Sequence, residues 1–246
     1  MRRRTALAVL AVIGASPATG WAMTLQFDPG PRAAEPLEWA GLLTLLAVAP
    51  ALLVMLTSFT RIVIVLSLLR QALGLQQQPP NMVLTGIALF LTLFVMMPVA
   101  KTIKKQALEP YLSGGLEPQA ALARAEEPLR EFMLKQTRKE DLAMSRLLLA
   151  KGATADLSGV TADPTALPFY ALVPAFISSE LTAAFRIGFL IYLPFMAIDL
   201  AISAILMALG MFMLPPTLVS LPLKLLVFTL ASGWPLLLRG LMLSFR

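Results

Sequence analysis

Apolar residues along this chain gather into long runs that are separated by proline pairs and by one polar stretch. The runs lie at residues 40–70, 82–100, 169–213 and 217–244. About 20 apolar residues are enough to cross a bilayer as a helix, so each run is long enough to span. The pattern therefore predicts two hydrophobic helical hairpins, at residues 40–100 and 169–246.

Prolines divide and bend these runs. The turn at residues 76–81 contains two adjacent prolines and closes the first hairpin, while Pro215 and Pro216 end the third run sharply. Further prolines lie inside the runs, where each frees a backbone carbonyl that lipid cannot satisfy. Long kinked helices packed into an assembly are therefore favoured over helices that stand alone in lipid.

The polar stretch, residues 101–168, holds nearly all the acidic residues of the chain with matching basic ones. Residues 117–137 and 138–151 are predicted to form amphipathic helices, and residues 152–168 read as a loop because they are rich in Gly, Pro, Thr and Asp. This stretch is predicted to be a small helical insert. The apolar stripe expected on its second helix consists of Leu142, Leu148 and Leu149.

Residues 1–22 have the pattern of a cleaved signal peptide. Three arginines at residues 2–4 precede a short apolar core, and small residues allow cleavage between Ala22 and Met23. An uncleaved anchor helix is the alternative, but the apolar core is too short to span. Residues 23–39 are polar and rich in proline, which indicates a flexible segment.

A cleaved leader followed by four spans places the insert outside the cytoplasm, in the periplasm. The positive-inside rule disagrees, because Lys101, Lys104 and Lys105 lie at the start of the insert. The leader acts first during insertion, so we give it precedence. The rule also does not apply to hydrophobic helices that other subunits bury.

Composition narrows the possible functions. Hydrophobic residues make up 58% of the chain and charged residues 14%, against about 25% charged in soluble domains. The chain has no Cys and no His, which excludes disulfides, thiolate or imidazole metal sites and the usual nucleophilic triads. The net charge of +6 includes the leader arginines and does not form a nucleic-acid footprint. No cofactor is expected.

Five charged residues lie in or beside the apolar runs: Arg61, Glu180, Arg186, Asp199 and Lys224. A charge at the centre of a bilayer costs about 2.5–3.5 kcal/mol on insertion scales, so such residues face protein, water or a functional path. A turn at Pro215–Pro216 places Asp199 and Lys224 out of register, and Glu180 and Arg186 lie on different helix faces. Asp199 and Lys224 are therefore predicted to pair between subunits, and Glu180 and Arg186 to need partners outside the chain, or water. The alternative for each charge is an ion pair within the bundle or a position near the membrane interface.

Residues 207–216 are rich in methionine. Met207 and Met211 are spaced to share one helical face, and Met213 follows just before the proline pair. Methionine is flexible and fills irregular gaps, so one hypothesis is ordinary packing in a bundle. The other is a soft apolar ring that seals a pore and lets a chain pass.

Several of these motifs, in this order and spacing, resemble the FliP family of flagellar export-gate proteins. The resemblance runs from about residue 40 to the C-terminus. It is carried by the Met-rich segment and by residues 56–66, 77–81, 128–133, 174–181, 194–199 and 221–224.

The resemblance implies a core subunit of the flagellar type III protein export gate, through which unfolded flagellar proteins pass. Family members assemble as five copies, with FliQ-like and FliR-like subunits, into a closed helical pore in the bacterial inner membrane at the flagellar basal body. Met211 and Met213 match the family's gasket, with Phe212 where relatives often have Met. Phe132 and Glu180 match positions at subunit contacts.

Two other hypotheses follow from the residues. A small oligomeric ion or proton channel would use Asp199 as its relay carboxylate. A membrane enzyme is the weakest hypothesis, because the chain has no His, no zinc-protease motif and no paired aspartates in facing spans.

Overall fold

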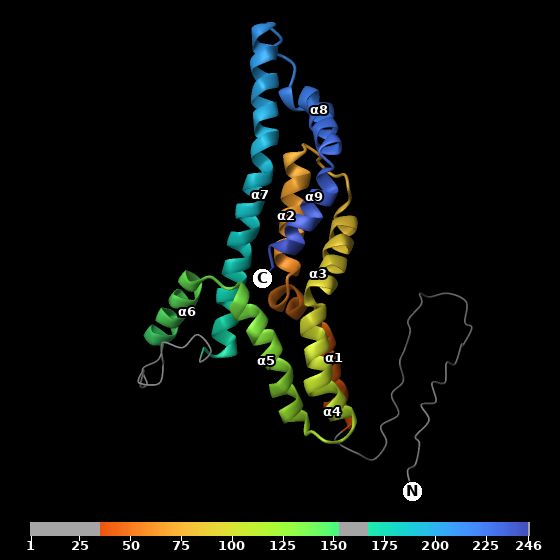
Figure 1. The fold of residues 1–246 in the computed structure, drawn as a ribbon, viewed down its shortest axis with the longest axis vertical. Coiled ribbons are helices and arrows are strands. Elements are labelled where there is room, and N and C mark those ends of the chain that lie inside the picture. Colours follow the sequence, from red (N-terminus) through yellow and green to blue (C-terminus); the bar gives the residue numbers. More distant parts are fainter. Residues whose placement is uncertain (1–34, 153–166, 246) are drawn as a thin grey trace, which may run out of the picture. The chain divides into compact units, whose positions relative to one another are not determined.

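A computed structural model describes residues 35–152 and 167–245 of the chain (Figure 1). These residues form helices joined by short turns, without a strand in the described ranges, so the predicted all-α class is confirmed. The predicted leader, with its cleavage site between Ala22 and Met23, and most of the 152–168 loop lie outside them. The chain divides into two units, residues 1–44 and 45–246, and the account below concerns the second.

The first apolar run is broken into two helices, so the prediction of one helix over residues 40–70 is wrong. They are α1 (Glu35–Leu56) and α2 (Phe59–Ala72). At the break, the Thr57 hydroxyl donates to the Leu53 carbonyl at 2.5 Å and the Thr60 hydroxyl donates to the Val54 carbonyl at 2.5 Å. These side chains replace the backbone bonds that a continuous helix would make.

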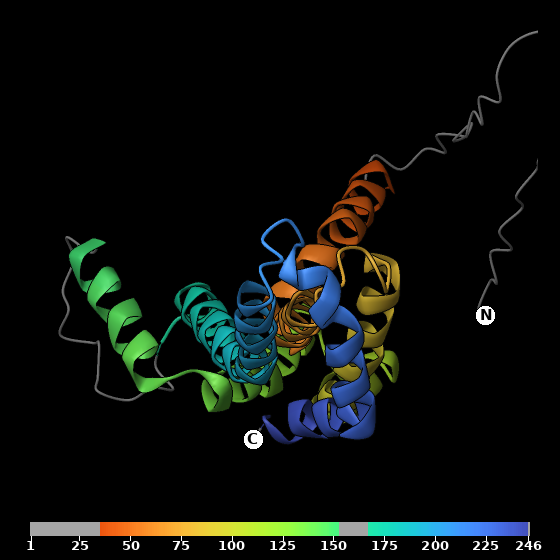
Figure 2. The same ribbon diagram turned by 90° about the horizontal axis from the view of Figure 1, so that it is seen from above.

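Helix α2 is the central helix of the second unit. It lies between α7 and α3 in both views (Figure 1; Figure 2), and Ile62, Val65 and Leu66 on it are almost fully buried. Gly188 of α7 permits the close approach of the two helices, because a Cβ atom there would lie 2.2 Å from Leu68 Cδ1. The core of the second unit is thus built around α2, which comes from the first apolar run of the chain.

The second run forms α3 (Asn81–Ile103), which continues through a π-helical turn, η1 (Lys104–Leu108), into α4 (Glu109–Leu112). The predicted end near Pro98 is wrong. A proline removes one backbone donor and bends a helix, and Thr102 donates its hydroxyl to the Pro98 carbonyl at 3.1 Å one turn later.

The polar insert contains two helices within two residues of the predicted ones, α5 (Pro118–Gln136) and α6 (Lys139–Gly152). Helix α5 packs on α3 and α7, and α6 packs on α7. Leu142 is buried and Leu149 half-buried as predicted, but Leu148 is exposed. Ser145 is buried in the same face instead and donates to the Ala171 carbonyl at 2.6 Å.

The third run forms α7 (Phe169–Ala208), a helix of 40 residues. It ends seven residues before Pro215, so the prediction that the proline pair ends it is wrong. Gly210 has a φ of 74°, its N–H donates to the Met207 carbonyl, and the Met211 N–H donates to the Leu206 carbonyl at 2.9 Å. This is the Schellman end of a helix, for which glycine is suited because it has no Cβ.

The last run is also two helices, α8 (Pro216–Leu230) and α9 (Gly233–Leu243), which meet at 66°. The predicted last span over residues 217–244 is therefore bent in its middle, and whether it crosses a membrane as one span stays a prediction. Ser232 adopts a left-handed φ of 52°, and the Phe228 ring lies against Gly233 where a Cβ would be. Within the described residues, three helices are long and apolar enough to cross a membrane, or four if this bent pair is one span.

Candidate functional site

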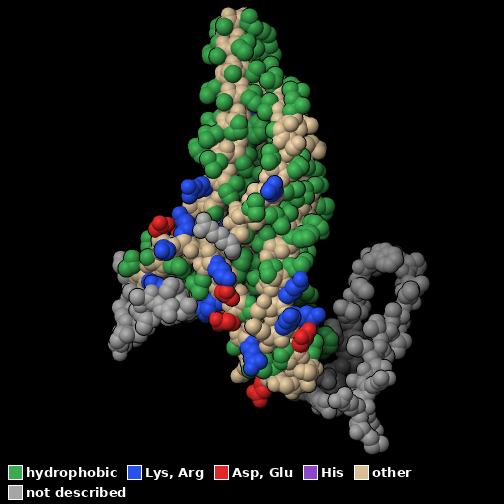
Figure 3. Space-filling view, in the orientation of Figure 1, with side chains coloured by type: hydrophobic (Ala, Val, Ile, Leu, Met, Phe, Trp, Pro, Cys, Tyr) green, Lys and Arg blue, Asp and Glu red, His purple; other side chains and the backbone are tan. Residues whose placement is uncertain are grey.

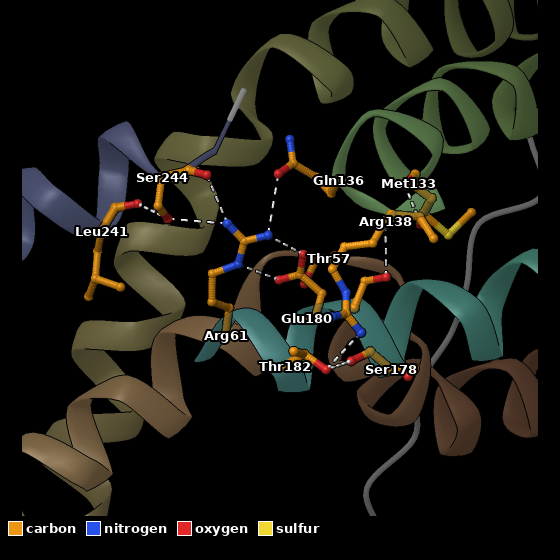
Figure 4. Close-up of polar contacts among 12 residues, drawn as sticks. Thr57, Arg61, Met133, Gln136, Arg138, Ser178, Glu180, Thr182, Leu241 and Ser244 are labelled. Carbon is orange, nitrogen blue, oxygen red and sulfur yellow. Dashed lines mark hydrogen bonds and ion pairs between the residues drawn. The ribbon is translucent and has the colours of Figure 1, made fainter. Parts of the chain in front are cut away.

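Arg61 of α2 lies at the centre of a buried polar cluster (Figure 4). Its Nε donates to Glu180 Oε2 at 2.9 Å and its Nη2 donates to Oε1 at 2.5 Å, a bidentate pair whose side chains are 4% and 0% exposed. The prediction that Glu180 needs a partner outside the chain is wrong. That prediction considered only Arg186 on the same helix, whereas the partner comes from α2, 119 residues away.

The same guanidinium contacts two more segments. Nη1 donates to the Ser244 carbonyl at 2.9 Å, Nη2 donates to Gln136 Oε1 at 3.3 Å, and the Phe245 ring centroid lies 4.1 Å from the guanidinium carbon. We call Arg61, Gln136, Glu180, Ser244 and Phe245 the Arg61 cluster. Through it α2, α5, α7 and the segment after α9 are held by one side chain.

A second cluster joins α7, α8 and the end of α2. Lys224 Nζ donates to Asp199 Oδ2 at 2.6 Å and to the carbonyl of Ala72 at 3.1 Å, and the Ser220 hydroxyl donates to Asp199 Oδ1 at 2.6 Å. Ala72 is the last residue of α2, where a cation complements the helix dipole. We call these four residues the Lys224 cluster.

The prediction that Asp199 and Lys224 cannot meet within one chain is wrong. It took the proline pair as the turn of the hairpin. Because α7 ends at Ala208 and α8 begins at Pro216, the turn is centred near residue 212. Asp199 then lies opposite about residue 225, next to Lys224.

A third cluster attaches the insert to α7 and was not predicted. The Ser178 hydroxyl donates to Asp141 Oδ1 at 2.9 Å, and the Ser179 hydroxyl donates to Oδ2 at 2.5 Å. Arg138 donates from Nε to Asp141 Oδ2 at 2.8 Å and from Nη2 to Thr182 Oγ1 at 3.0 Å. Adjacent serines inside an apolar run are the sequence signal that could have indicated this contact.

The groups around Asp141 determine its charge state. Partial burial raises the pKa of its carboxyl, but the hydrogen bonds from Ser179, Ser178 and Arg138, with the positive charge of Arg138, outweigh burial and hold the pKa below its usual value. The carboxylate therefore stays charged, and the contact between α6 and α7 persists at neutral pH.

Arg186 differs from the other charges in the apolar helices. It is exposed on α7, as are Phe185 and Phe189 near it in the sequence. It makes no hydrogen bond or ion pair with any residue that the structure describes. A partner in another subunit remains a prediction for this residue.

Phe132 packs inside the chain. It is buried on α5, and its ring meets that of Phe176 edge to face at a centroid distance of 5.9 Å. The structure thus places both Phe132 and Glu180 in contacts within one chain. Their role at subunit contacts, which the resemblance implies, remains a prediction.

The Met-rich segment forms the exposed tip of the α7–α8 hairpin (Figure 1). Met207, Phe212 and Met213 are largely exposed, Met213 to 97%, and Met211 is 41% exposed. Met207 and Met211 do not share a helical face as predicted, because the helix ends between them. On the face shown in Figure 3, hydrophobic side chains cover the hairpin near this tip, and charged ones gather over the insert.

The sequence model described as the FliP family matches residues 42–241. The chain belongs to the FliP family. This confirms the resemblance and, at the level of the family, the predicted part in flagellar export. The methionine tip and all residues of the three clusters except Ser244 and Phe245 lie inside the matched region.

Curated relatives of this FliP-family chain carry the name flagellar biosynthetic protein FliP. The protein of Cereibacter sphaeroides is 49% identical over 85% of this chain and 67% of its own length. That of Pectobacterium carotovorum is 50% identical over 83% and 76%, and that of Bacillus subtilis is 47% identical over 83% and 89%.

The geometry of this FliP-family chain is that of a structural component. Among residues 35–152 and 167–245, no group of three metal-ligating side chains gathers. The buried charges are instead arranged in pairs that fix helices against one another. The surface they leave uncovered is apolar and suited to contact with protein or lipid.

Proposed function

We propose that this chain is a core subunit of the flagellar type III protein export gate. Copies of it form the pore through which unfolded flagellar proteins leave the cell. The observation that carries the proposal is the tip of the α7–α8 hairpin, where Met211, Phe212 and Met213 project from a helix pair whose base is fixed by ion pairs. The flagellar biosynthetic proteins to which the chain is similar support it.

The tip residues suit a seal that deforms and recloses. A methionine side chain has three rotatable bonds and a polarizable sulfur, so it adapts to irregular surfaces. Met211, Phe212 and Met213, with Met207 below them, would form an apolar ring around the axis of the assembly. An unfolded chain would push these side chains aside, and the energy for transport would come from other parts of the apparatus.

The buried charges fit a supporting role better than proton transport. Asp199 has one oxygen bonded by Lys224 and the other by Ser220. A relay carboxylate must be free to exchange protons with water, whereas both oxygens of this partly exposed carboxylate are engaged in holding α7 against α8. The gate is therefore preferred over a proton channel.

We further propose five copies per assembly, together with FliQ-like and FliR-like subunits, in the bacterial inner membrane, with the α5–α6 insert in the periplasm. The large apolar surface of α3, α7 and α8, of which much is exposed in the single chain, supports an assembly. Arg186, which lacks a partner among the described residues, supports contacts with acidic groups outside the chain.

The test is the native mass of the gently extracted protein, co-expressed with candidate FliQ-like and FliR-like partners. One species with about five copies and small membrane partners is expected. In that assembly Asp199→Asn should change assembly or leak. A stable monomer or dimer that conducts ions in liposomes, with conduction abolished by Asp199→Asn, would contradict the proposal.

A further inference from the structure

Helices α8 and α9 meet at an elbow that consists of Ala231 and Ser232. Ser232 is the only residue other than glycine with a positive φ within residues 35–152 and 167–245, and strained backbone of this kind is typical of hinges and switches. Pro235 follows in the first turn of α9, and in one straight helix its ring would collide with the carbonyl of Ala231. Among the described residues, no backbone hydrogen bond joins α8 to α9. The angle between the two helices therefore depends on side-chain packing.

The Phe228 side chain of α8 supplies this packing. Its ring fills the space beside Gly233, where a Cβ atom would lie 2.2 Å from the ring carbon Cε2. The ring also meets Trp234 of α9 edge to face at a centroid distance of 5.6 Å, and it lies 6.3 Å from the ring of Phe195 on α7. One buried ring thus contacts both sides of the elbow and the neighbouring helix.

Helix α9 is the firmly held side of the elbow. Leu237 and Leu241 are buried in the same hydrophobic core as the apolar side chains of α2. Directly after the helix, Arg61 donates to the carbonyl of Ser244 at 2.9 Å. Both the middle and the end of α9 are therefore attached to the centre of the second unit.

Helix α8 is held less firmly and lies beside α7 (Figure 1). Only three of its 15 residues are buried, and they are Ser220, Lys224 and Phe228. Their spacing of four places them in one line along the helix. Ser220 and Lys224 both bind Asp199 of α7, and most of the other side chains of α8 are exposed. One row of contacts therefore holds α8.

The position of this row gives α8 the proportions of a lever. Lys224 lies about 12 Å along the helix from Ser232, and Pro216, next to the methionine tip, lies about 24 Å from it. A swing of about 10° at the elbow would move Lys224 by about 2 Å and the tip by about 4 Å. The four-carbon stem of a lysine is flexible, so its ammonium group can stay on Asp199 through the smaller movement. The tip can therefore move while the ion pair is kept.

We propose that α8 is a lever that pivots at Ser232 and Gly233, and that Phe228, seated against Gly233, is the latch that keeps the lever in its closed position. A few residues at the ends of elements absorb hinge motions in proteins, and the elbow occupies such a position. The consequence for export rests on the proposed function, because a swing of α8 would displace Met211 and Met213 from their ring. The lever itself is a property of the single chain.

The test measures two distances between pairs of spin labels on the full chain in lipid nanodiscs. The chain has no cysteine, so labels attach only where a cysteine is introduced. Gln71→Cys on α2 is combined either with Leu218→Cys near the tip of α8 or with Leu243→Cys at the end of α9, and all three side chains are exposed. A broad distribution is expected for the distance from α2 to α8 and a narrow one for the distance from α2 to α9. Equal widths would overturn the lever.

Gly233→Ala should release the latch, because the new Cβ takes the place of the Phe228 ring. The distance from α2 to α8 should shift by about 4 Å, as the lever proportions require, while the distance from α2 to α9 stays unchanged. Gly240→Ala is the matched control on the same helix, since a Cβ there meets nothing within 4 Å. Adding Phe228→Leu to Gly233→Ala should return the distance towards that of the wild type. Equal shifts of both distances would overturn the proposal.

Phe228→Leu alone provides the test if Gly233→Ala does not fold. It keeps an apolar side chain but removes the ring contacts with Trp234 and Phe195, so the distribution from α2 to α8 should widen. No widening would overturn the latch. A broad distribution in a chain that forms no five-copy assembly would support the lever and contradict the proposed function. A narrow distribution in a chain that does assemble would overturn the lever alone.

Discussion

The two ends of helix α7 differ in how their surfaces are satisfied. Around Glu180, which is fully buried, the helix contacts α2 and α5 through the Arg61 cluster and α6 through the hydrogen bonds of Asp141 and Arg138. Beyond Leu206, the chain turns through Met211 and Met213 with its side chains largely exposed. One helix therefore carries both a rigid base and a tip that nothing within the described chain covers.

This difference indicates that the region around Glu180 contributes to the stability of the single chain, whereas the tip is able to rearrange. Buried ion pairs are costly to break, because the remaining partner is left charged in a dry site. Exposed methionines contribute little to the folded chain and are free to rearrange. A gate needs both, since its seal must deform without unfolding the subunit that carries it.

The largest effect is expected at the base. Arg61→Ala leaves the Glu180 carboxylate buried and unpaired, so the free energy of unfolding in mixed micelles should fall by about 3–5 kcal/mol. Arg186→Ala is the matched control, because that arginine is exposed and lacks a described partner. It should change stability by less than about 0.5 kcal/mol, and equal losses in the two variants would contradict the distinction.

Lys224→Met should lower the free energy of unfolding by about 2–3 kcal/mol. It removes charged hydrogen bonds to Asp199 and to the Ala72 carbonyl, but Asp199 is partly exposed and water can replace some of the loss. Lys139→Met, on the exposed side of α6, serves as the control. An unchanged Lys224 variant would mean that the cluster does not hold α8.

Gly188→Ala should cost about 1–3 kcal/mol, because the new Cβ would crowd Leu68 and push α2 from α7. Adding Leu68→Ala should recover part of the loss. Gly86→Ala provides the comparison, since a Cβ there meets nothing within 4 Å. If both glycine variants behave alike, the close approach of α2 and α7 is not a constraint.

Acid should weaken the contact between α6 and α7 before it weakens the Arg61 cluster. The pKa of Asp141 lies below its ordinary value near 3.8, so its contribution to stability is complete above that pH and is lost as pH falls through the lowered pKa. Protection of the α6 amides from hydrogen exchange, taken relative to the intrinsic exchange rate at each pH, should therefore be high at pH 6 and fall at the lowest accessible pH. Asp141→Asn should exchange faster at pH 6, with a weaker dependence on pH.

The smallest effect on folding is expected at the tip. Met213 is almost fully exposed, so Met213→Ala should leave the free energy of unfolding within about 0.5 kcal/mol of the wild type. In the assembled gate the same change should raise ion leak, because the ring loses volume. A loss of stability without a change in leak would place Met213 in the subunit's fold and not in a seal.

The sequence was sufficient to predict that the apolar runs are helical. It was not sufficient to predict where the helices end or which residues they contact. The hydrophobic runs predicted where α3 and α7 lie, because each run must bury or cover apolar surface, but the first and last runs are each divided into two helices. The end of α7 was missed because the proline pair was preferred over Gly210, although a glycine just after a periodic run is itself a stop signal. That error shifted the register and separated Asp199 from Lys224.

Other contacts carry no local signal. The Arg61–Glu180 pair joins residues 119 positions apart, and the break after Leu56 depends on which carbonyls the hydroxyls of Thr57 and Thr60 reach. The residues of the tip were predicted, since a methionine cluster is visible in the sequence. Their exposure was not, because it depends on how the hairpin ends.

The most direct test of the central claim uses the absence of cysteine from the chain. Met213→Cys introduces a single thiol at the tip, and Met144→Cys introduces one on the exposed side of α6 as the control. In the assembled gate, an oxidant or a short thiol crosslinker should join Met213→Cys chains into covalent dimers and block export. Met144→Cys chains should stay uncrosslinked, and export should continue. Tips that stay uncrosslinked and freely labelled by a bulky maleimide would contradict a seal formed by neighbouring copies.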